Sequence, residues 1–158
     1  MMIKSLSILL IAFGFTSPTL IDKLGFYKAF ESNSKEKIEG KITGLSKMRP
    51  SNSKDAYIGA LTMKQSQFMR TPKEKVNLFK EGRILLEKAI EKEPKNGEYR
   101  FLRFAIQENV PKILKYASNI SEDIDHIVRT YKSMDPTLRK VIKEYAKQSA
   151  HLSVERLK

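Results

Sequence analysis

The amino-acid sequence predicts an all-α protein of about six or seven helices, in which consecutive helices pair as antiparallel hairpins. Glycine and proline, the two residues that most disfavour a helix interior, are scarce, at 7 and 6 of 158 residues. Apolar residues recur at spacings of three and four positions, which is the helical period. No stretch alternates between apolar and polar residues for long enough to predict a strand.

Seven segments carry this helical pattern, and the short links between them favour antiparallel neighbours. We expect helices near residues 21–31, 34–46, 53–69, 72–93, 97–108, 120–133 and 136–149. A broken segment that begins at Asn109-Val110-Pro111 separates the fifth helix from the sixth. No linker divides the chain, so we expect a single helical domain over residues 20–158.

Capping signals mark the start of most of these helices. Each is a side chain that accepts a hydrogen bond from a backbone N–H of the first turn, usually followed three positions later by an acid. The clearest is Thr71 with Glu74, because Pro72 occupies the first helical position, where its missing N–H is harmless. The other predicted caps are Asn33 with Glu36, Asn52 with Asp55, Asn119 with Glu122 (or Ser121 followed by two acids), and Asp135 before Pro136.

Apolar stripes on three of the predicted helices indicate the faces that they bury. Each stripe lies on one side of a helix whose other side is charged. The stripes are Val76, Phe79, Leu86, Ala89 and Ile90; Ile120, Ile124, Ile127, Val128 and Tyr131; and Leu138, Val141, Ile142, Tyr145 and Ala146.

The first nineteen residues have the layout of a secretory signal peptide. A charged start that includes Lys4 precedes an apolar run from Leu6 to Phe15, and small or turn-forming residues follow at 16–19. The apolar run is too short to span a bilayer comfortably. We therefore expect residues 1–19 to be a signal peptide and the protein to be exported, to the periplasm or outside the cell. A retained anchor and a buried first helix are the alternatives.

The charge of the chain points to anionic partners. Thirty Lys and Arg against 18 Asp and Glu give a formal charge of +12, which attracts nucleic acid, acidic glycan, anionic lipid or acidic protein. Export makes nucleic acid an unlikely partner, because an exported protein meets envelope lipid, glycans and other proteins instead. The chain has no cysteine, which excludes disulfides and thiolate chemistry.

Residues 86–99 resemble the end of a tetratricopeptide repeat. In that repeat a small residue of the second helix precedes, by five positions, a proline that stops the helix. Leu86, Ala89 and Pro94 match these positions, and Tyr57, Gly59, Ala60 and Leu61 match the preceding first helix. A degenerate second copy aligns Val128, Tyr131 and Pro136. The resemblance implies a short array of stacked hairpins with a groove that binds peptide or protein.

The layout is also similar to small exported bacterial proteins of unassigned function. The likeness is carried by the segments Glu98-Tyr99-Arg100-Phe101-Leu102-Arg103 and Gln107-Glu108-Asn109-Val110-Pro111, which follow a signal peptide. This second resemblance implies no function.

The candidate ligand-binding residues lie on the predicted fifth helix and on the loop that follows it. Arg100 and Arg103 share one helix face, where two guanidiniums can grip a carboxylate or phosphate. The alternative is that both pair with acids of the chain, such as Glu98 or an acid on a neighbouring helix. The full candidate set is Tyr99, Arg100, Arg103, Gln107, Asn109, Lys115 and Tyr116. The loop has its own alternative, a connector that plugs the core through Ile113 and Leu114.

The sequence does not favour catalysis or metal binding. His126 with Glu122 and Asp123 has the spacing of a metal site, but acids in the first turn are what a helix N-terminus prefers electrostatically. The motifs GxSxG, HExxH, GxxxxGK[ST] and GxGxxG are absent. We therefore expect no enzyme activity, no cofactor and no metal site.

Two functions are consistent with these observations. The first is a non-catalytic module that binds a protein or peptide partner through the groove near Tyr99–Asn109. The alternative is a basic envelope-associated protein that binds anionic lipid or glycan. Its basic C-terminal stretch is Arg139, Lys140, Lys143, Lys147, Arg156 and Lys158.

Overall fold

The computed structural model describes residues 21–158, which form seven α-helices and no strand, as the sequence predicts. The predicted signal peptide, residues 1–19, lies outside the described residues. No helix within residues 21–158 is long and apolar enough to span a membrane. The helices are α1 (Lys23–Glu31), α2 (Lys35–Ser46), α3 (Asn52–Gln65), α4 (Pro72–Lys92), α5 (Gly97–Asn109), α6 (Ile120–Thr130) and α7 (Pro136–Ala146). Short 3-10 turns lie at Ser66–Phe68, Lys112–Leu114, Tyr131–Ser133 and Val154–Leu157.

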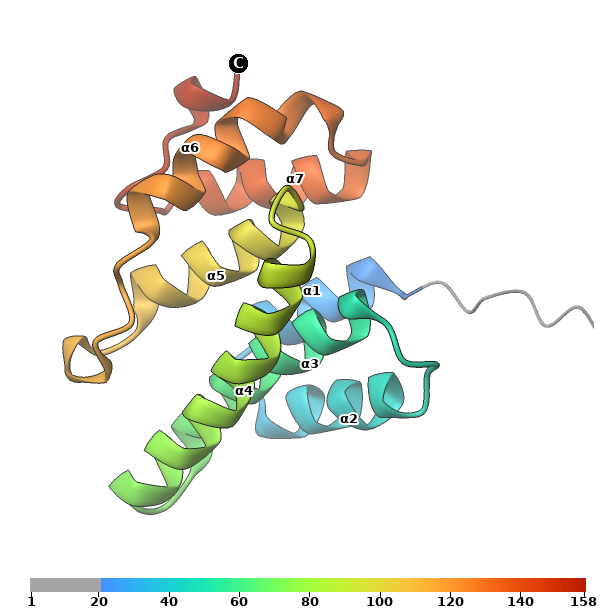
Figure 1. Cartoon of the computed structure of the whole chain (residues 1–158), viewed down its shortest axis with the longest axis vertical. Coiled ribbons are helices and arrows are strands. Elements are labelled where there is room, and N and C mark those ends of the chain that lie inside the picture. The colour runs from blue at the N-terminus through green and yellow to red at the C-terminus, as the bar shows by residue number, and fades with distance from the viewer. Residues whose placement is uncertain (1–20) are drawn as a thin grey trace, which may run out of the picture.

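The helices pack as adjacent pairs, which confirms the predicted hairpins (Figure 1). α1 pairs with α2, α3 with α4, and α5 with α6, and the α3–α4 hairpin is the most extensive of the three. The pairs are joined because α3 also contacts α1, α2 and α5. The last helix, α7, returns to contact α1.

An aromatic cluster joins the four odd-numbered helices, α1, α3, α5 and α7. Phe26 of α1 stacks on Tyr57 of α3, with ring centroids 4.2 Å apart. Phe101 of α5 contacts Tyr27 of α1 and meets Tyr145 of α7 edge to face. Such aromatic pairs are typically worth about 0.5–1.5 kcal/mol beyond the area they bury. The core is therefore centred on α3 and α5, because half of the residues of α3 and most of those of α5 are buried.

Two glycines allow the α3–α4 hairpin to close tightly. A Cβ built on Gly59 would lie 2.6 Å from the carbonyl oxygen of Gly82, and one built on Gly82 would lie 2.5 Å from the carbonyl oxygen of Gly59. Real Cβ atoms do not approach backbone this closely, so each helix needs a residue without a side chain at the crossing. Leu86 and Ala89, the residues that resemble a repeat, are both buried in α4.

The helix caps follow the sequence signals with two one-residue errors. Thr71 forms the predicted capping box with Glu74, and Asp135 caps α7. The caps predicted at Asn33 and Asn52 are wrong, because the neighbouring serines, Ser34 and Ser51, accept the first-turn hydrogen bonds instead. Serine and asparagine cap about equally well, so the capping residue type alone did not fix the helix start.

At the start of α6, Asn119 occupies the predicted cap position but makes no capping hydrogen bond. Its Oδ1 instead accepts from the side chains of Gln107, at 3.3 Å, and Ser118, at 3.0 Å. The asparagine therefore ties α6 to α5 and to the connecting loop.

Candidate functional site

A buried ion-pair cluster joins the middle of α5 to the first turn of α6. Arg103 donates to the two carboxylate oxygens of Asp123 through Nε and Nη2, both at 2.7 Å, which is the bidentate geometry. Arg100 adds a third hydrogen bond to Asp123 through Nη1 at 3.0 Å. The side chain of Asp123 is 0% exposed and that of Arg103 is 6% exposed, so this charge pair lies out of water.

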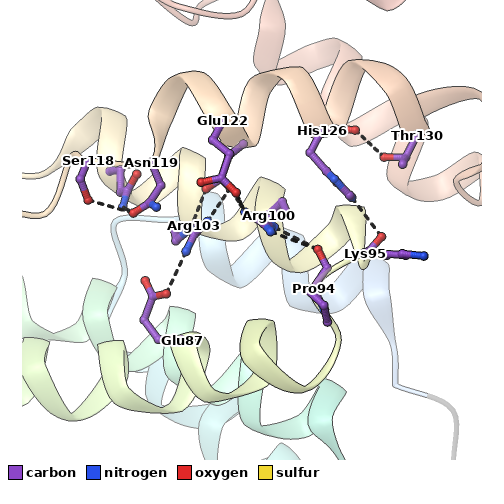
Figure 2. Close-up of polar contacts among 12 residues, drawn as sticks. Glu87, Pro94, Lys95, Arg100, Arg103, Ser118, Asn119, Glu122, His126 and Thr130 are labelled. Atoms are coloured by element: carbon purple, nitrogen blue, oxygen red, sulfur yellow. Dashed lines mark hydrogen bonds and ion pairs between the residues drawn. The ribbon is translucent and has the colours of Figure 1, made fainter.

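Two further carboxylates complete the cluster. Glu122 accepts from Arg100 at 2.6 Å, and Glu87 of α4 accepts from Arg103 at 2.9 Å. Figure 2 shows the two arginines between α6 and the Glu87 side chain of α4. Burial acts to lower the pKa of Arg103, but the hydrogen bonds and charges of Asp123 and Glu87 raise it above its usual value. An external anion would therefore have to displace a carboxylate of the chain to reach either guanidinium.

Tyr99 belongs to a second polar cluster at the amino end of α5. Its hydroxyl lies 3.0 Å from that of Ser53, and its ring is buried. The adjacent Glu98 accepts hydrogen bonds from Tyr57 at 2.6 Å, from Tyr27 at 2.9 Å and from Lys23 at 2.8 Å. Lys23 also donates to Asp135 at 2.6 Å. The amino ends of α1, α5 and α7 therefore meet at one cluster, so these three helices run in the same direction.

The structure places three other predicted site residues, Gln107, Lys115 and Tyr116, in different surroundings. Tyr116 is buried, and it donates to Glu87 at 2.5 Å beneath the guanidinium of Arg83. Lys115 is exposed and has a positive φ of 46°. Gln107 is buried, and its Oε1 has no hydrogen-bond partner within residues 21–158. The alternative of a connector that plugs the core is wrong for Ile113, which is 87% exposed, but Leu114 packs against the core and Tyr116 is buried in it.

Asn109 lies elsewhere, in a cleft where the carboxyl ends of α1, α3, α5 and α7 meet. The cleft measures about 900 Å³. Asn109 is the one residue of the seven predicted that lines it. Its Nδ2 donates to the carbonyl oxygen of Ala105 at 2.9 Å and to the hydroxyl of Tyr145 at 2.8 Å. The apolar lining is Phe30, Met63, Phe79, Ala105, Ile106, Val110 and Leu114.

Polar side chains without internal partners also line this cleft. The carboxamides of Asn33, Gln67 and Gln148 make no hydrogen bond within the part of the chain that the structure describes. The Nζ of Lys64 lies 5.5 Å from the ring centroid of Phe30 and forms no ion pair there. Burial lowers the pKa of Lys64, while the nearby charge of Glu31 acts to raise it. The cleft therefore presents open donors and acceptors beside apolar surface.

Glu108 fastens the C-terminal segment to one side of the cleft. Its carboxylate accepts from the backbone N–H groups of Ala150, at 2.8 Å, and His151, at 3.1 Å. The hydroxyls of Ser149, at 2.7 Å, and Tyr145, at 2.5 Å, donate to it as well. Burial acts to raise the pKa of Glu108, but these hydrogen bonds outweigh it and hold the pKa below its usual 4.5.

The hydrogen bonds to the Glu108 carboxylate predict that the folded protein loses stability in acid. A carboxylate whose pKa is lower in the folded chain contributes stability that is present above its unfolded pKa, near 4.5, and lost as the pH falls below that value. Glu108→Gln should lower the free energy of unfolding by about 1–2 kcal/mol at neutral pH, and by progressively less as the pH falls below 4.5. Urea unfolding of the native protein and of Glu108→Gln, from neutral pH to below pH 4.5, measures this difference. A difference that is constant with pH would contradict the assignment.

His126 and its neighbouring acids do not converge. The ring Nε2 of His126 lies 3.0 Å from the carbonyl oxygen of Lys95, as Figure 2 shows, whereas Glu122 and Asp123 are bonded to Arg100. Within residues 21–158, no group of three His, Asp or Glu side chains is placed to hold a metal ion.

Comparison with known proteins adds no family to this description. No family model matches the chain, and no curated protein and no solved structure is significantly similar to it. The resemblance to tetratricopeptide repeats therefore stays an expectation that rests on residues 86–99 and on the pairing of the helices.

The sequence analysis missed the residues that form the cleft. Phe30, Lys64, Phe79 and Glu108 come from four different helices, and only the tertiary fold brings them together. Three signals were available, since Phe79 and Tyr145 belong to the apolar stripes of α4 and α7 and Asn109 is a predicted site residue. Nothing in a single sequence indicates that either stripe continues into an open cleft.

Proposed function

We propose that this protein is a non-catalytic binding module that takes an extended peptide segment of a partner protein in the cleft. The observation that carries the proposal is the set of exposed carboxamides, Asn33, Gln67 and Gln148, that line the cleft beside apolar side chains and make no hydrogen bond within residues 21–158. A carboxamide donates and accepts, as a peptide backbone does. The backbone of an extended peptide laid across these side chains would satisfy both the donor and the acceptor of each carboxamide.

The dimensions of the cleft support a ligand of peptide size. Ligand sites typically enclose about 300–1,000 Å³, and this cleft has about 900 Å³. Phe30, Phe79 and Leu114 offer apolar contact to the side chains of a bound segment. Full burial of one large apolar side chain is worth about 1.5–3 kcal/mol, so two anchors offset a substantial part of the entropy lost on binding.

The position of Lys64 favours a bound peptide that contains an acidic residue. Its ammonium is half-buried, and no carboxylate within residues 21–158 lies within ion-pair distance of it. Lys75 adds a second cation to the lining. Of the two acids in the cleft, Glu108 is already occupied by its donors, and Glu31 is exposed. A carboxylate that reached Lys64 would form a partly desolvated ion pair, which is stronger than one on the surface.

The setting we propose is outside the cytoplasm, on a scaffold similar to a short tetratricopeptide array. The layout of residues 1–19 supports export, and the pairs α1–α2, α3–α4 and α5–α6 support the likeness. Binding of anionic lipid or glycan is the second candidate function, and the net charge of +12 favours it. Lys140 and Lys143 of α7 are exposed and could contact such a surface.

The cleft can be tested by filling it. Ala150 is exposed and lines the cleft, so Ala150→Trp should obstruct it without disturbing the core. We expect peptides selected from a displayed random library on the native protein to bind Ala150→Trp at least about tenfold more weakly. Fluorescence anisotropy measures this. The matched control is Thr137→Trp, an exposed site at the opposite end of α7.

Salt distinguishes the two candidate functions. Binding in the cleft through apolar contacts should largely survive high salt, whereas attachment of a basic surface to anionic vesicles or polysaccharide should weaken steeply. Selected peptides that bind both tryptophan variants equally, or recovery only of vesicle binding at low salt, would overturn the proposal.

A further inference from the structure

Gly40 and Gly44 in α2 have no role in the packing of the described chain. A Cβ built on either would meet nothing within 4 Å. Gly59 and Gly82 are different, because a Cβ there would strike backbone. A glycine inside a helix costs about 0.8–1 kcal/mol relative to alanine. This chain therefore carries two destabilising residues on one face of α2 where larger side chains would fit.

Within residues 21–158, the two glycines lie in a groove formed by α1, α2 and the residues that flank them. The groove measures about 600 Å³, and every residue that lines it lies between Ile21 and Met48. Its apolar lining is formed by the partly exposed Ile21 and Met48, which flank the two helices, and by the edges of the buried Ala29 and Leu45. Both helices also contact α3, for instance where Phe26 of α1 stacks on Tyr57. The groove is thus on a side of the α1–α2 pair that no later helix covers.

The charge around the groove is positive. Lys28, Lys37 and Lys41 line it together with a single acid, Asp22. Asp22 is already paired with Lys41 at 3.1 Å. Lys28 and Lys37 are exposed and form no ion pair within residues 21–158, so the unneutralised charge beside the apolar surface is theirs. Two copies of this groove would repel each other, which argues against a second copy of the chain as the occupant.

We infer that the α1–α2 groove docks an amphipathic helix of a partner protein, with acidic residues flanking its apolar stripe. A shallow groove along two helices suits a helix better than an acyl chain, which needs an enclosed tunnel. Glycines four residues apart lie on one face and let a partner's backbone or a large side chain approach α2 closely. Glutamates beside the stripe would meet Lys28 and Lys37. This site is separate from the cleft and does not depend on it.

The test uses synthetic peptides of roughly 14 residues, long enough for about four helical turns. One carries leucines at helical spacing with flanking glutamates, a second carries lysines in place of the glutamates, and a third contains a central proline. We expect the full-length protein to bind the first with a Kd in the micromolar range, and the other two at least about tenfold more weakly.

Substitutions then locate the binding. Gly44→Leu fills the groove and should weaken the glutamate peptide about tenfold, while raising the Tm by about 2–4 °C. Thr43→Leu places the same leucine side chain on an exposed position of α2 that does not line the groove, and should leave the Kd unchanged. Lys28→Glu with Lys37→Glu should reverse the preference between the first two peptides.

Three outcomes would overturn the inference. These are equal binding of the glutamate and lysine peptides, binding by Gly44→Leu that matches the native protein, and a groove that binds anionic vesicles but not the glutamate peptide. The rise in Tm separates a filled groove from a misfolded variant.

Discussion

Replacing Asp123 with alanine should lower the free energy of unfolding by about 3–5 kcal/mol, the range for breaking a buried ion pair. Asp123 is 0% exposed and accepts from both Arg100 and Arg103. Its removal leaves the Arg103 guanidinium, whose side chain is 6% exposed, with only Glu87 to balance it. The free energy comes from urea unfolding monitored by circular dichroism.

Two further variants show whether burial of the charge is the cause. Glu122 also accepts from Arg100, but its side chain is 60% exposed, so Glu122→Ala should lower the stability by less than about 1 kcal/mol. Arg103→Met combined with Asp123→Leu removes both charges and should recover most of the loss from Asp123→Ala. An Asp123→Ala variant as stable as Glu122→Ala would contradict a structural role for the cluster.

Gly82→Ala should destabilise the protein, whereas the same substitution at Gly40 should stabilise it. At Gly82 the new methyl group would lie 2.5 Å from the carbonyl oxygen of Gly59 and 2.7 Å from the backbone nitrogen of Met63. The hairpin must then open, at a loss of roughly 1–3 kcal/mol. At Gly40 nothing lies within 4 Å, so the better helix propensity of alanine should add about 0.5–1 kcal/mol.

Differential scanning calorimetry compares the Tm of Gly82→Ala with that of Gly40→Ala, two variants that carry the same substitution. Both positions are in helix interiors, and the substitution is the same, so the propensity gain is common to both. Opposite changes in Tm would assign the difference to the α3–α4 contact. An increase in Tm for Gly82→Ala would show that the two helices can separate at little cost.

The helices were predictable because their signals are local. Thr71, Pro72 and Glu74 specify the start of α4 within four residues of sequence, and the apolar stripes follow from a fixed helical period. The errors at Ser34 and Ser51 are also local, since two good capping residues stand side by side in each case.

The candidate site was less predictable because the role of its arginines depends on residues that are far from them in the sequence. Arg100 and Arg103 share a helix face, as their spacing requires. The residues that face them, Glu87 and Asp123, lie 16 and 20 positions from Arg103, and a spacing rule does not reach that far. The alternative that the arginines pair with acids of the chain is confirmed for neighbouring helices, since Glu122, Asp123 and Glu87 bond with them. It is wrong for Glu98, which bonds with Lys23, Tyr27 and Tyr57 instead.

These contacts separate two roles along α5. Its middle, with Arg100 and Arg103, is bonded inside the molecule, and its carboxyl end, with Glu108 and Asn109, borders the cleft. Alanine at both arginines would leave Asp123 buried without a partner, so we expect those substitutions to act on stability first. Substitutions at the cleft, such as Ala150→Trp, act where we propose the peptide binds.

The most direct test of the proposed binding site puts a fluorescent reporter beside the cleft and another at the arginine cluster. The chain has no cysteine, so Lys112→Cys, next to the cleft residue Pro111, and Ser121→Cys, beside Asp123, each offer one site for an environment-sensitive fluorophore. Both positions are exposed, and neither lines the cleft. On titration with a library-selected peptide, we predict a saturable change from the label at position 112 and none from the label at position 121. A response confined to position 121 would contradict the account and return binding to the arginine cluster.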